Sequence, residues 1–129
     1  MVEEQIGSQV VFNQPAGHVD PGESIVAAVK REVLEETAYV FTPEALIGVY
    51  ELTAGSEQRQ YVRFCFSGPA HGPVPDRELD TEILRACWIS REDLVKLTPR
   101  LRSHLVLACI DDYESGRRHP LDLIHASDV

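Results

Sequence analysis

The chain has 129 residues, a formal net charge of −9 at pH 7 and three cysteines without a CxxC spacing. This length suits one domain with a single hydrophobic core, and three scattered cysteines are typical of reduced thiols, so we expect a cytoplasmic protein. The acidic balance excludes general binding to nucleic acid or to an anionic membrane, because both attract basic protein surfaces.

Residues 1–16 have room for little more than a short β-hairpin. Its turn is predicted near Gly7, and its second strand runs through residues 10–12. Pro15 biases the residue before it away from helical angles, so we expect the chain to approach Gly17 in an extended conformation.

A loop and then a helix follow. Pro21 and Gly22 signal a turn, and Ser24 is a good N-cap for a helix that begins at Ile25. His18 in this loop invites a catalytic interpretation. A histidine in a loop is more often solvated or hydrogen-bonded, and we favour that alternative.

The predicted helix changes character along one face. At about 100° per residue, the stripe that starts with Ile25, Ala28 and Val29 continues to Glu32 and Glu36. The stripe therefore begins as a contact with the core and ends in acidic side chains.

Three glutamates, Glu32, Glu35 and Glu36, stand at i, i+3 and i+4 in this acidic part. Carboxylates on a face that begins against the core repel one another and lose solvation. A divalent cation offsets that cost, so the sequence predicts a metal site. Such a site also lets an acidic protein receive an anionic substrate, because bound cations reverse the local field.

The middle of the chain predicts a second hairpin. Residues 44–52 and 59–66 have the pattern of strands and flank a turn at residues 54–57, which indicates an antiparallel pair. Arg63 lies on the second strand among apolar neighbours. Two interpretations stay open, a surface arginine at a sheet edge and a clamp that grips phosphate oxygens in two places.

The next segment is a loop, a strand and a helix. Proline and glycine predict the loop over residues 67–79, and a short strand follows over residues 82–89. Ser90 and Asp93 form a capping box for a helix over residues 91–97.

A longer helix is predicted over residues 101–115, and a last strand over residues 121–124. Arg117 and Arg118 between them can contact a substrate phosphate, but cations are also favourable at a helix C-terminus, and we favour this second interpretation. Together the elements predict an α/β sandwich with a mixed sheet between helical layers.

The region around the glutamates resembles the signature box of the Nudix hydrolases, which cut a diphosphate linkage in nucleoside diphosphate derivatives using magnesium or manganese. Six invariant positions of that box are met, at Gly17, Glu23, Arg31, Glu32, Glu35 and Glu36. One position departs, because the family usually has glycine where this chain has Ala38. An alanine with positive φ costs about 1 kcal/mol there, so we expect a local shift and an active protein.

The resemblance implies a role for each matched residue. Carboxylates and one backbone carbonyl would hold Mg²⁺ or Mn²⁺, those of Glu32, Glu35, Glu36 and Ala16. Arg31 would orient the carboxylates, with Glu23 as its partner. Gly17 would contact the substrate, a small nucleotide or diphosphate. Arg63, outside the box, would also contact it under the clamp interpretation.

The family often places an additional acidic residue just before the strand that ends near Trp88. Glu82 matches best by its distance from that strand, ahead of Asp80 and Glu78. Either Glu35 or Glu82 would take the proton from the attacking water, since members of the family differ in which residue serves.

Segments outside the box are similar to the NudJ-type phosphatases, a bacterial group within the family. These segments are NQPAGHVDPGES, YVRF, WISRED and YESGRRHPL. The similarity implies hydrolysis of nucleoside tri- and diphosphates and of hydroxymethylpyrimidine diphosphate, with release of phosphate, by a monomer or homodimer. Three alternatives stay open: a housekeeping pyrophosphohydrolase of oxidised nucleotides or ADP-ribose, a non-catalytic nucleotide-binding regulator, and an acidic capped helix that holds no metal.

The family fold also carries a strand upstream of the first predicted hairpin, near the middle of its sheet. Two interpretations compete: the chain begins at an internal methionine, or it is complete and leaves a sheet edge open. We favour the fragment, because an unpaired central edge would be unstable and prone to aggregation. The expected fold is therefore a Nudix-type α/β/α sandwich that lacks the N-terminal strand of the family.

Overall fold

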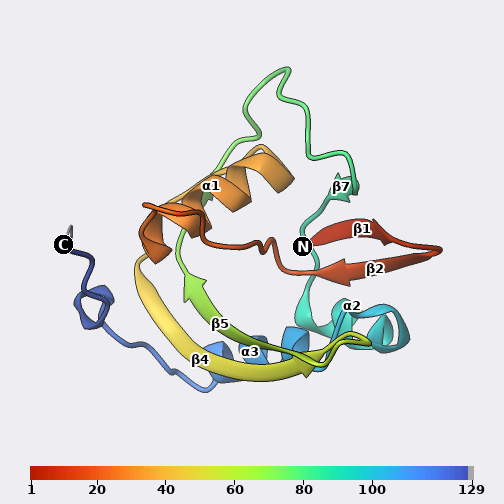
Figure 1. The fold of residues 1–129 in the computed structure, drawn as a ribbon. Coiled ribbons are helices and arrows are strands. Elements are labelled where there is room, and N and C mark those ends of the chain that lie inside the picture. Colours follow the sequence, from red (N-terminus) through yellow and green to blue (C-terminus); the bar gives the residue numbers. More distant parts are fainter. Residues whose placement is uncertain (128–129) are drawn as a thin grey trace.

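The computed structural model describes residues 1–127 (Figure 1). Its elements in chain order are β1 (Val2–Ile6), β2 (Gln9–Asn13), α1 (Ile25–Thr37), β3 (Val40–Phe41), β4 (Ala45–Ala54), β5 (Arg59–Ser67), β6 (Ala70–His71), β7 (Ile83–Ala86), α2 (Arg91–Lys96), the 3₁₀-helix η1 (Thr98–Arg100), α3 (Leu105–Glu114) and the 3₁₀-helix η2 (Leu121–Leu123). Helix α1 lies on one side of the long β4–β5 hairpin and α3 lies on the other. This layering is the predicted α/β sandwich.

The strands pair in three groups of antiparallel neighbours. The largest has the order β2-β1-β7, and β4–β5 and β3–β6 form two-stranded sheets. A parallel bridge joins Phe12 to Leu101, so the described residues contain both kinds of pairing. Both predicted hairpins are confirmed, and Ile6 lies opposite Gln9 at the turn of the first.

One edge of β5 is free of strand pairing within the part of the chain that the structure describes, because β5 pairs there with β4 alone. That the chain lacks an upstream strand of the family stays a prediction.

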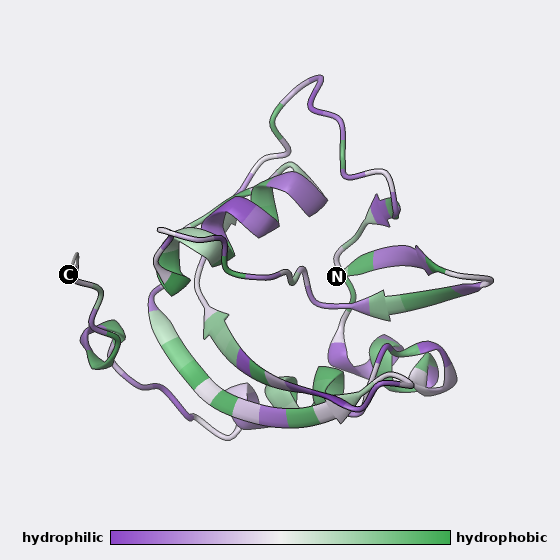
Figure 2. Cartoon of the chain, in the orientation of Figure 1, coloured by the Kyte–Doolittle hydropathy of each residue, from purple (hydrophilic) through white to green (hydrophobic). Residues whose placement is uncertain are grey.

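Apolar side chains from the strands and from the inner faces of the helices make the core. Leu46 and Ile47 of β4 are almost fully buried, and so are Val2 of β1 and Val106 of α3. Full burial of one such aliphatic side chain stabilises the fold by about 1.5–3 kcal/mol. Figure 2 shows hydrophobic segments along β4, and hydrophobic and hydrophilic segments side by side on α1. None of the described helices is long and apolar enough to cross a membrane.

Both ends of α1 follow from local sequence. The hydroxyl of Ser24 accepts a hydrogen bond from the backbone N–H of Ala27 at 3.0 Å, which caps the first turn. At the other end, Ala38 has a left-handed conformation with φ of 63°, and its N–H donates to the carbonyl of Leu34. The helix stop that glycine usually provides is therefore kept by alanine, at a cost of about 1 kcal/mol.

Two strands differ from the sequence prediction. The segment over residues 67–79, predicted as a loop, includes β6, which pairs with β3. The strand predicted over residues 82–89 spans only Ile83–Ala86. The capping box after it is confirmed, since the hydroxyl of Ser90 accepts a hydrogen bond from the N–H of Asp93.

The helix predicted over residues 101–115 begins later, at Leu105. Pro99 lies in η1, and Leu101 leaves that turn in an extended conformation and forms the parallel bridge to Phe12. A long-range pairing therefore overrides the local pattern that predicted helix from residue 101.

The strand predicted over residues 121–124 is wrong. Residues Leu121–Leu123 form the 3₁₀-helix η2, which a backbone hydrogen bond to the carbonyl of Pro120 closes. The segment after α3 pairs instead at His119, which exchanges two backbone hydrogen bonds with Leu46. The chain turns into η2 at Leu121, so the pairing does not continue.

The two arginines after α3 contact the helix end. The guanidinium of Arg118 donates to the carbonyl of Tyr113 at 2.8 Å and lies 3.8 Å from the centre of its ring. Arg117 lies 3.7 Å from a carboxylate oxygen of Asp112. These contacts support the favoured interpretation of cations at a helix C-terminus.

Candidate metal and phosphate site

Three carboxylates converge on the C-terminal half of α1. One oxygen each of Glu32, Glu35 and Asp80 lies within 4.8 Å of the other two. Helix α1 supplies the first two, and the loop before β7 supplies Asp80, whose backbone N–H donates to the carbonyl of Glu35 at 3.0 Å. Carboxylate oxygens at this spacing suit a hard divalent cation such as Mg²⁺ or Mn²⁺. We call these three residues the acid cluster.

Glu36 lies deeper than the acid cluster. The residue is 5% exposed, and its Oε1 accepts a hydrogen bond from the N–H of Ala16 at 2.9 Å. Burial raises the pKa of its carboxyl to about 8; the bond from Ala16 opposes the rise, and the charges of Glu32, Glu4 and Asp80 add to it. Among the described residues no cation pairs with this carboxylate. A bound cation would relieve its cost.

Glu32 and Asp80 share this electrostatic environment. Desolvation raises the pKa of the Glu32 carboxyl, a hydrogen bond from Arg31 opposes that rise, and the charge of Glu35 adds to it. Desolvation also raises the pKa of Asp80, again with a contribution from Glu35. The carboxylates therefore destabilise one another when ionised, and this donor set fits a divalent cation.

Arg31 connects the acid cluster to the loop before α1. Its Nε and Nη2 donate to the two carboxylate oxygens of Glu23 at 2.7 and 2.9 Å. Its Nη1 donates to Glu32 at 2.8 Å and to Glu35 at 3.1 Å, and Nη2 also reaches the carbonyl of His18 at 2.9 Å. The bond to Arg31 holds the pKa of Glu23 at about 2, and the same bond raises the pKa of the arginine. This geometry fixes the direction of both glutamates on α1.

Gly17 leaves room for the carboxylate of Glu32. A Cβ at this position would overlap the carboxylate carbon and both oxygens of that side chain. Ala16, directly before it, is bonded to Glu36, so this backbone segment is fixed against α1. The close approach explains why the first position of the box requires glycine.

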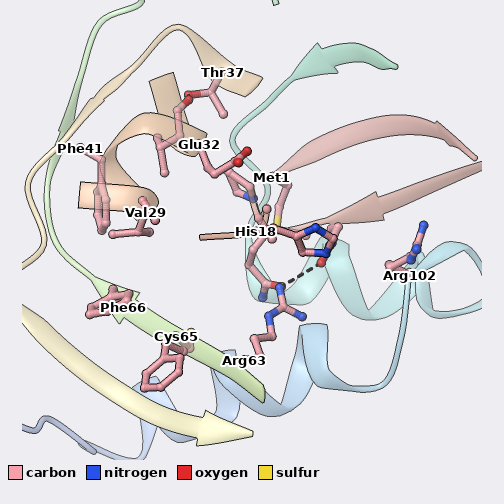
Figure 3. Close-up of a pocket in the computed structure, with 18 of the residues that line it drawn as sticks. Met1, His18, Val29, Glu32, Thr37, Phe41, Arg63, Cys65, Phe66 and Arg102 are labelled. Carbon is pink, nitrogen blue, oxygen red and sulfur yellow. Dashed lines mark hydrogen bonds between the residues drawn. The ribbon is translucent and has the colours of Figure 1, made fainter. Parts of the chain in front are cut away.

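A pocket of about 680 Å³ adjoins the acid cluster (Figure 3). Glu32 from α1 and Arg63 from β5 both line it. The Nη2 of Arg63 donates to side-chain oxygens of Asn13 at 3.1 Å and Gln14 at 3.0 Å, which leaves other N–H groups of the guanidinium for an anion. Apolar side chains line another part of the pocket, those of Val29, Phe41, Phe64 and Phe66.

The structure separates the acidic residues that precede β7. Asp80 lies in the acid cluster, whereas Glu82, the better match by sequence distance, is exposed and lies outside it. The backbone bond from Asp80 to Glu35 decides between them, and loop composition does not reveal such a bond. Sequence reasoning also missed Glu4 of β1, whose charge raises the pKa of Glu36. No pattern in its strand indicates that this side chain lies near Glu36.

Comparisons with known proteins agree with this geometry. A family model described as "NUDIX domain" matches residues 3–107. The phosphatase NudJ of Shigella boydii is 36% identical over 124 residues, which cover 96% of this chain and 80% of that protein. The phosphatase NudJ of Escherichia coli K12 is 35% identical over the same shares.

Two solved structures are similar over most of the chain. A NUDIX hydrolase from Nitrosomonas europaea superposes with a TM-score of 0.94 at 47% identity, covering 98% of this chain and 86% of that one. A MutT protein from Methanosarcina mazei superposes with a TM-score of 0.68 at 22% identity, covering 91% and 83%. The second likeness concerns the fold alone.

Proposed function

The chain belongs to the Nudix hydrolase family and is a hydrolase, and from this premise we propose that it cuts a phosphoanhydride bond in nucleoside tri- and diphosphates and in small diphosphates such as hydroxymethylpyrimidine diphosphate. The reaction depends on Mg²⁺ or Mn²⁺ and releases phosphate. The relatives named phosphatase NudJ support phosphate as the product. The cytoplasmic location and the monomeric or dimeric state stay predictions from the sequence.

The observation that carries this proposal is a group of neighbouring carboxylates that lose solvation and repel one another when ionised. Among the described residues Arg31 is the only one that forms a salt bridge with the acid cluster, and it is also engaged by Glu23, whereas Glu36 has no such partner. Without a further positive charge, such a site repels the phosphate of a substrate. A divalent ion reverses the local field and makes the site attractive to phosphate.

The ion would be held by the acid cluster, with Glu36 and the carbonyl of Ala16 as the further ligands that the family resemblance implies. When bound, it lowers the pKa of water and neutralises charge on the phosphate oxygens. Arg31 keeps Glu32 and Glu35 directed toward this position, and Arg63 grips phosphate oxygens from the other side of the pocket.

We assign to Glu35 the role of general base, which takes the proton from the attacking water. The side chain of Glu35 is 33% exposed against 14% for Glu32, so water reaches Glu35 more easily. Glu82 is the alternative, since its charge lies close enough to raise the pKa of Asp80. Glu35→Gln should lower kcat by about 100-fold or more, and Glu82→Gln should change it less. The reverse order of effects would move the role to Glu82.

The test of the proposed function measures phosphate and pyrophosphate separately. Nucleoside tri- and diphosphates and hydroxymethylpyrimidine diphosphate are incubated with the protein, with and without Mg²⁺. We expect phosphate release that requires the ion. Pyrophosphate as the sole product would instead assign a pyrophosphohydrolase, and no turnover of any substrate in saturating metal would indicate the non-catalytic regulator.

A further inference from the structure

Two aromatic rings from different elements face each other in the pocket. The imidazole of His18, in the loop before α1, and the phenol ring of Tyr61, on β5, lie nearly parallel at an interplanar angle of 19° with centroids 6.3 Å apart. Both side chains line the pocket, as do Glu32 and Arg63. Figure 3 shows His18 between the strand that carries Arg63 and the helix that carries Glu32.

The position of His18 depends on the acid cluster. Its carbonyl accepts a hydrogen bond from Arg31 at 2.9 Å, and Gly17, directly before it, lies against the carboxylate of Glu32. Neighbouring Cα atoms are about 3.8 Å apart, so the ring of His18 starts one residue away from backbone that touches the cluster. A group joined to a phosphate at the cluster by a short linker therefore reaches the ring pair.

The two rings form a stacked pair, since their interplanar angle of 19° and centroid distance of 6.3 Å lie within the range of aromatic rings in contact. His18 is exposed in a loop, so a rotation of its side chain can open the pair and present the face of Tyr61 to a planar guest. A sugar or an aliphatic chain has no flat π-face for this arrangement.

Arg63 lies on β5, the strand that also carries Tyr61. It is two residues from Tyr61, so both side chains leave the same face of β5. Its bonds to Asn13 and Gln14 hold the guanidinium in the pocket. The phosphate-binding groups and the aromatic pair therefore lie next to each other in the pocket, as the phosphates and the ring do in a ring-bearing diphosphate.

We propose that His18 and Tyr61 form the binding subsite for a planar heteroaromatic ring, so that the preferred substrates are diphosphates that carry a nucleobase or a free pyrimidine ring. The phosphate half of this inference rests on the proposed function. The ring half rests on the aromatic geometry alone. Specificity then comes from stacking, which accepts different heterocycles because each has a π-face.

The kinetic test compares a ring-bearing with a ring-free diphosphate, cytidine diphosphate with isopentenyl diphosphate. Tyr61→Leu and His18→Ala should each raise KM for cytidine diphosphate by about tenfold with little change in kcat, as expected for loss of one stacked face. Tyr61→Phe should restore most of the affinity. Tyr113→Leu, at a tyrosine outside the pocket, is the matched control. Equal effects on both diphosphates, or none on cytidine diphosphate, would overturn the subsite.

A binding measurement separates this inference from the proposed function. Cytidine, which carries the ring without a phosphate, is titrated into the metal-free protein and its variants, and chemical shifts of the nucleobase protons are followed by NMR. Binding that weakens in His18→Ala and in Tyr61→Leu supports the subsite even if no diphosphate is hydrolysed. Hydrolysis of diphosphates together with nucleobase binding that neither variant weakens would support the proposed function and contradict the subsite.

Discussion

Glu23 and Glu36 lie thirteen positions apart in the same box, and the protein treats them in opposite ways. Both carboxylate oxygens of Glu23 accept hydrogen bonds from Arg31, and these bonds hold the pKa of Glu23 at about 2. Glu36 is buried with one backbone donor, and burial raises its pKa to about 8. The difference shows that one acid is already neutralised by the fold, whereas the other still needs a positive charge. We infer that the first positions an arginine and the second binds metal.

The largest effect should come from Glu36→Gln. We expect loss of Mg²⁺-dependent turnover by more than about 100-fold, because a neutral amide replaces a charged metal ligand. The metal-free variant should nevertheless be at least as stable as the wild type at pH 8, since it no longer buries a carboxylate. Phosphate release and thermal unfolding measure the two effects.

The control for this variant is Glu51→Gln, the same change at an exposed position of β4. It should leave turnover and stability as they are. Wild-type turnover in Glu36→Gln would show that the two acids do not differ in the way proposed.

The second effect is a pH dependence of the metal-free protein. The pKa of Glu36 is about 8 in the folded state against 4.5 as the ordinary value, so the folded state holds the additional proton between these values. Stability should therefore fall as the pH rises from 4.5 to 8, by on the order of a few kcal/mol. Urea unfolding with a chelator present measures the slope. Glu36→Gln should reduce this slope, and the remainder belongs to Glu32 and Asp80, whose pKa values are also raised. A slope as steep in Glu36→Gln as in the wild type would contradict the role of Glu36.

A smaller effect should follow from Glu23→Gln. The amide cannot keep the bidentate bond, so Arg31 is free to turn away from Glu32 and Glu35. Loss of an orienting partner next to a metal site typically costs 10- to 100-fold in metal affinity or activity, and we expect a decrease in this range. Titration of activity with Mg²⁺ measures it, and a metal requirement equal to that of the wild type would contradict the positioning role.

The smallest effect concerns the C-terminal end of α1, where we expect a change in stability that leaves the roles of Glu23 and Glu36 in catalysis unaffected. Ala38→Gly should stabilise the protein by about 1 kcal/mol, because glycine adopts the positive φ of this position without strain. The turnover number should not change. Ala27→Gly, at an exposed position inside the same helix, should destabilise by a similar amount. Urea unfolding of both variants measures these changes, and a loss of stability in Ala38→Gly would show that the buried methyl group of Ala38 outweighs the strain at the helix stop.

Sequence reasoning succeeded where neighbours along the chain decide the structure. The cap at Ser24, the two hairpins and the shared face of Glu32, Glu35 and Glu36 all depend on spacings of a few residues. It failed where distant segments meet. The start of α3 depends on the bridge from Leu101 to the first hairpin, which no local pattern reveals.

The same division holds within the site. The box predicts the glutamates of α1, but a single backbone hydrogen bond brings Asp80 to them and leaves Glu82 at the surface. The stacking of His18 on Tyr61 joins a loop to a strand more than forty residues later, so neither residue carries a local sign of the pair. Side-chain groups that meet across the fold are visible only in three dimensions.

The most direct test is a calorimetric titration of the folded wild-type protein with Mg²⁺ and with Mn²⁺. We expect saturable uptake of at least one ion, which Glu36→Gln abolishes and Glu23→Gln weakens. If the wild-type protein takes up neither ion, with or without a nucleoside diphosphate present, then the buried acids of α1 do not bind metal and the central claim fails.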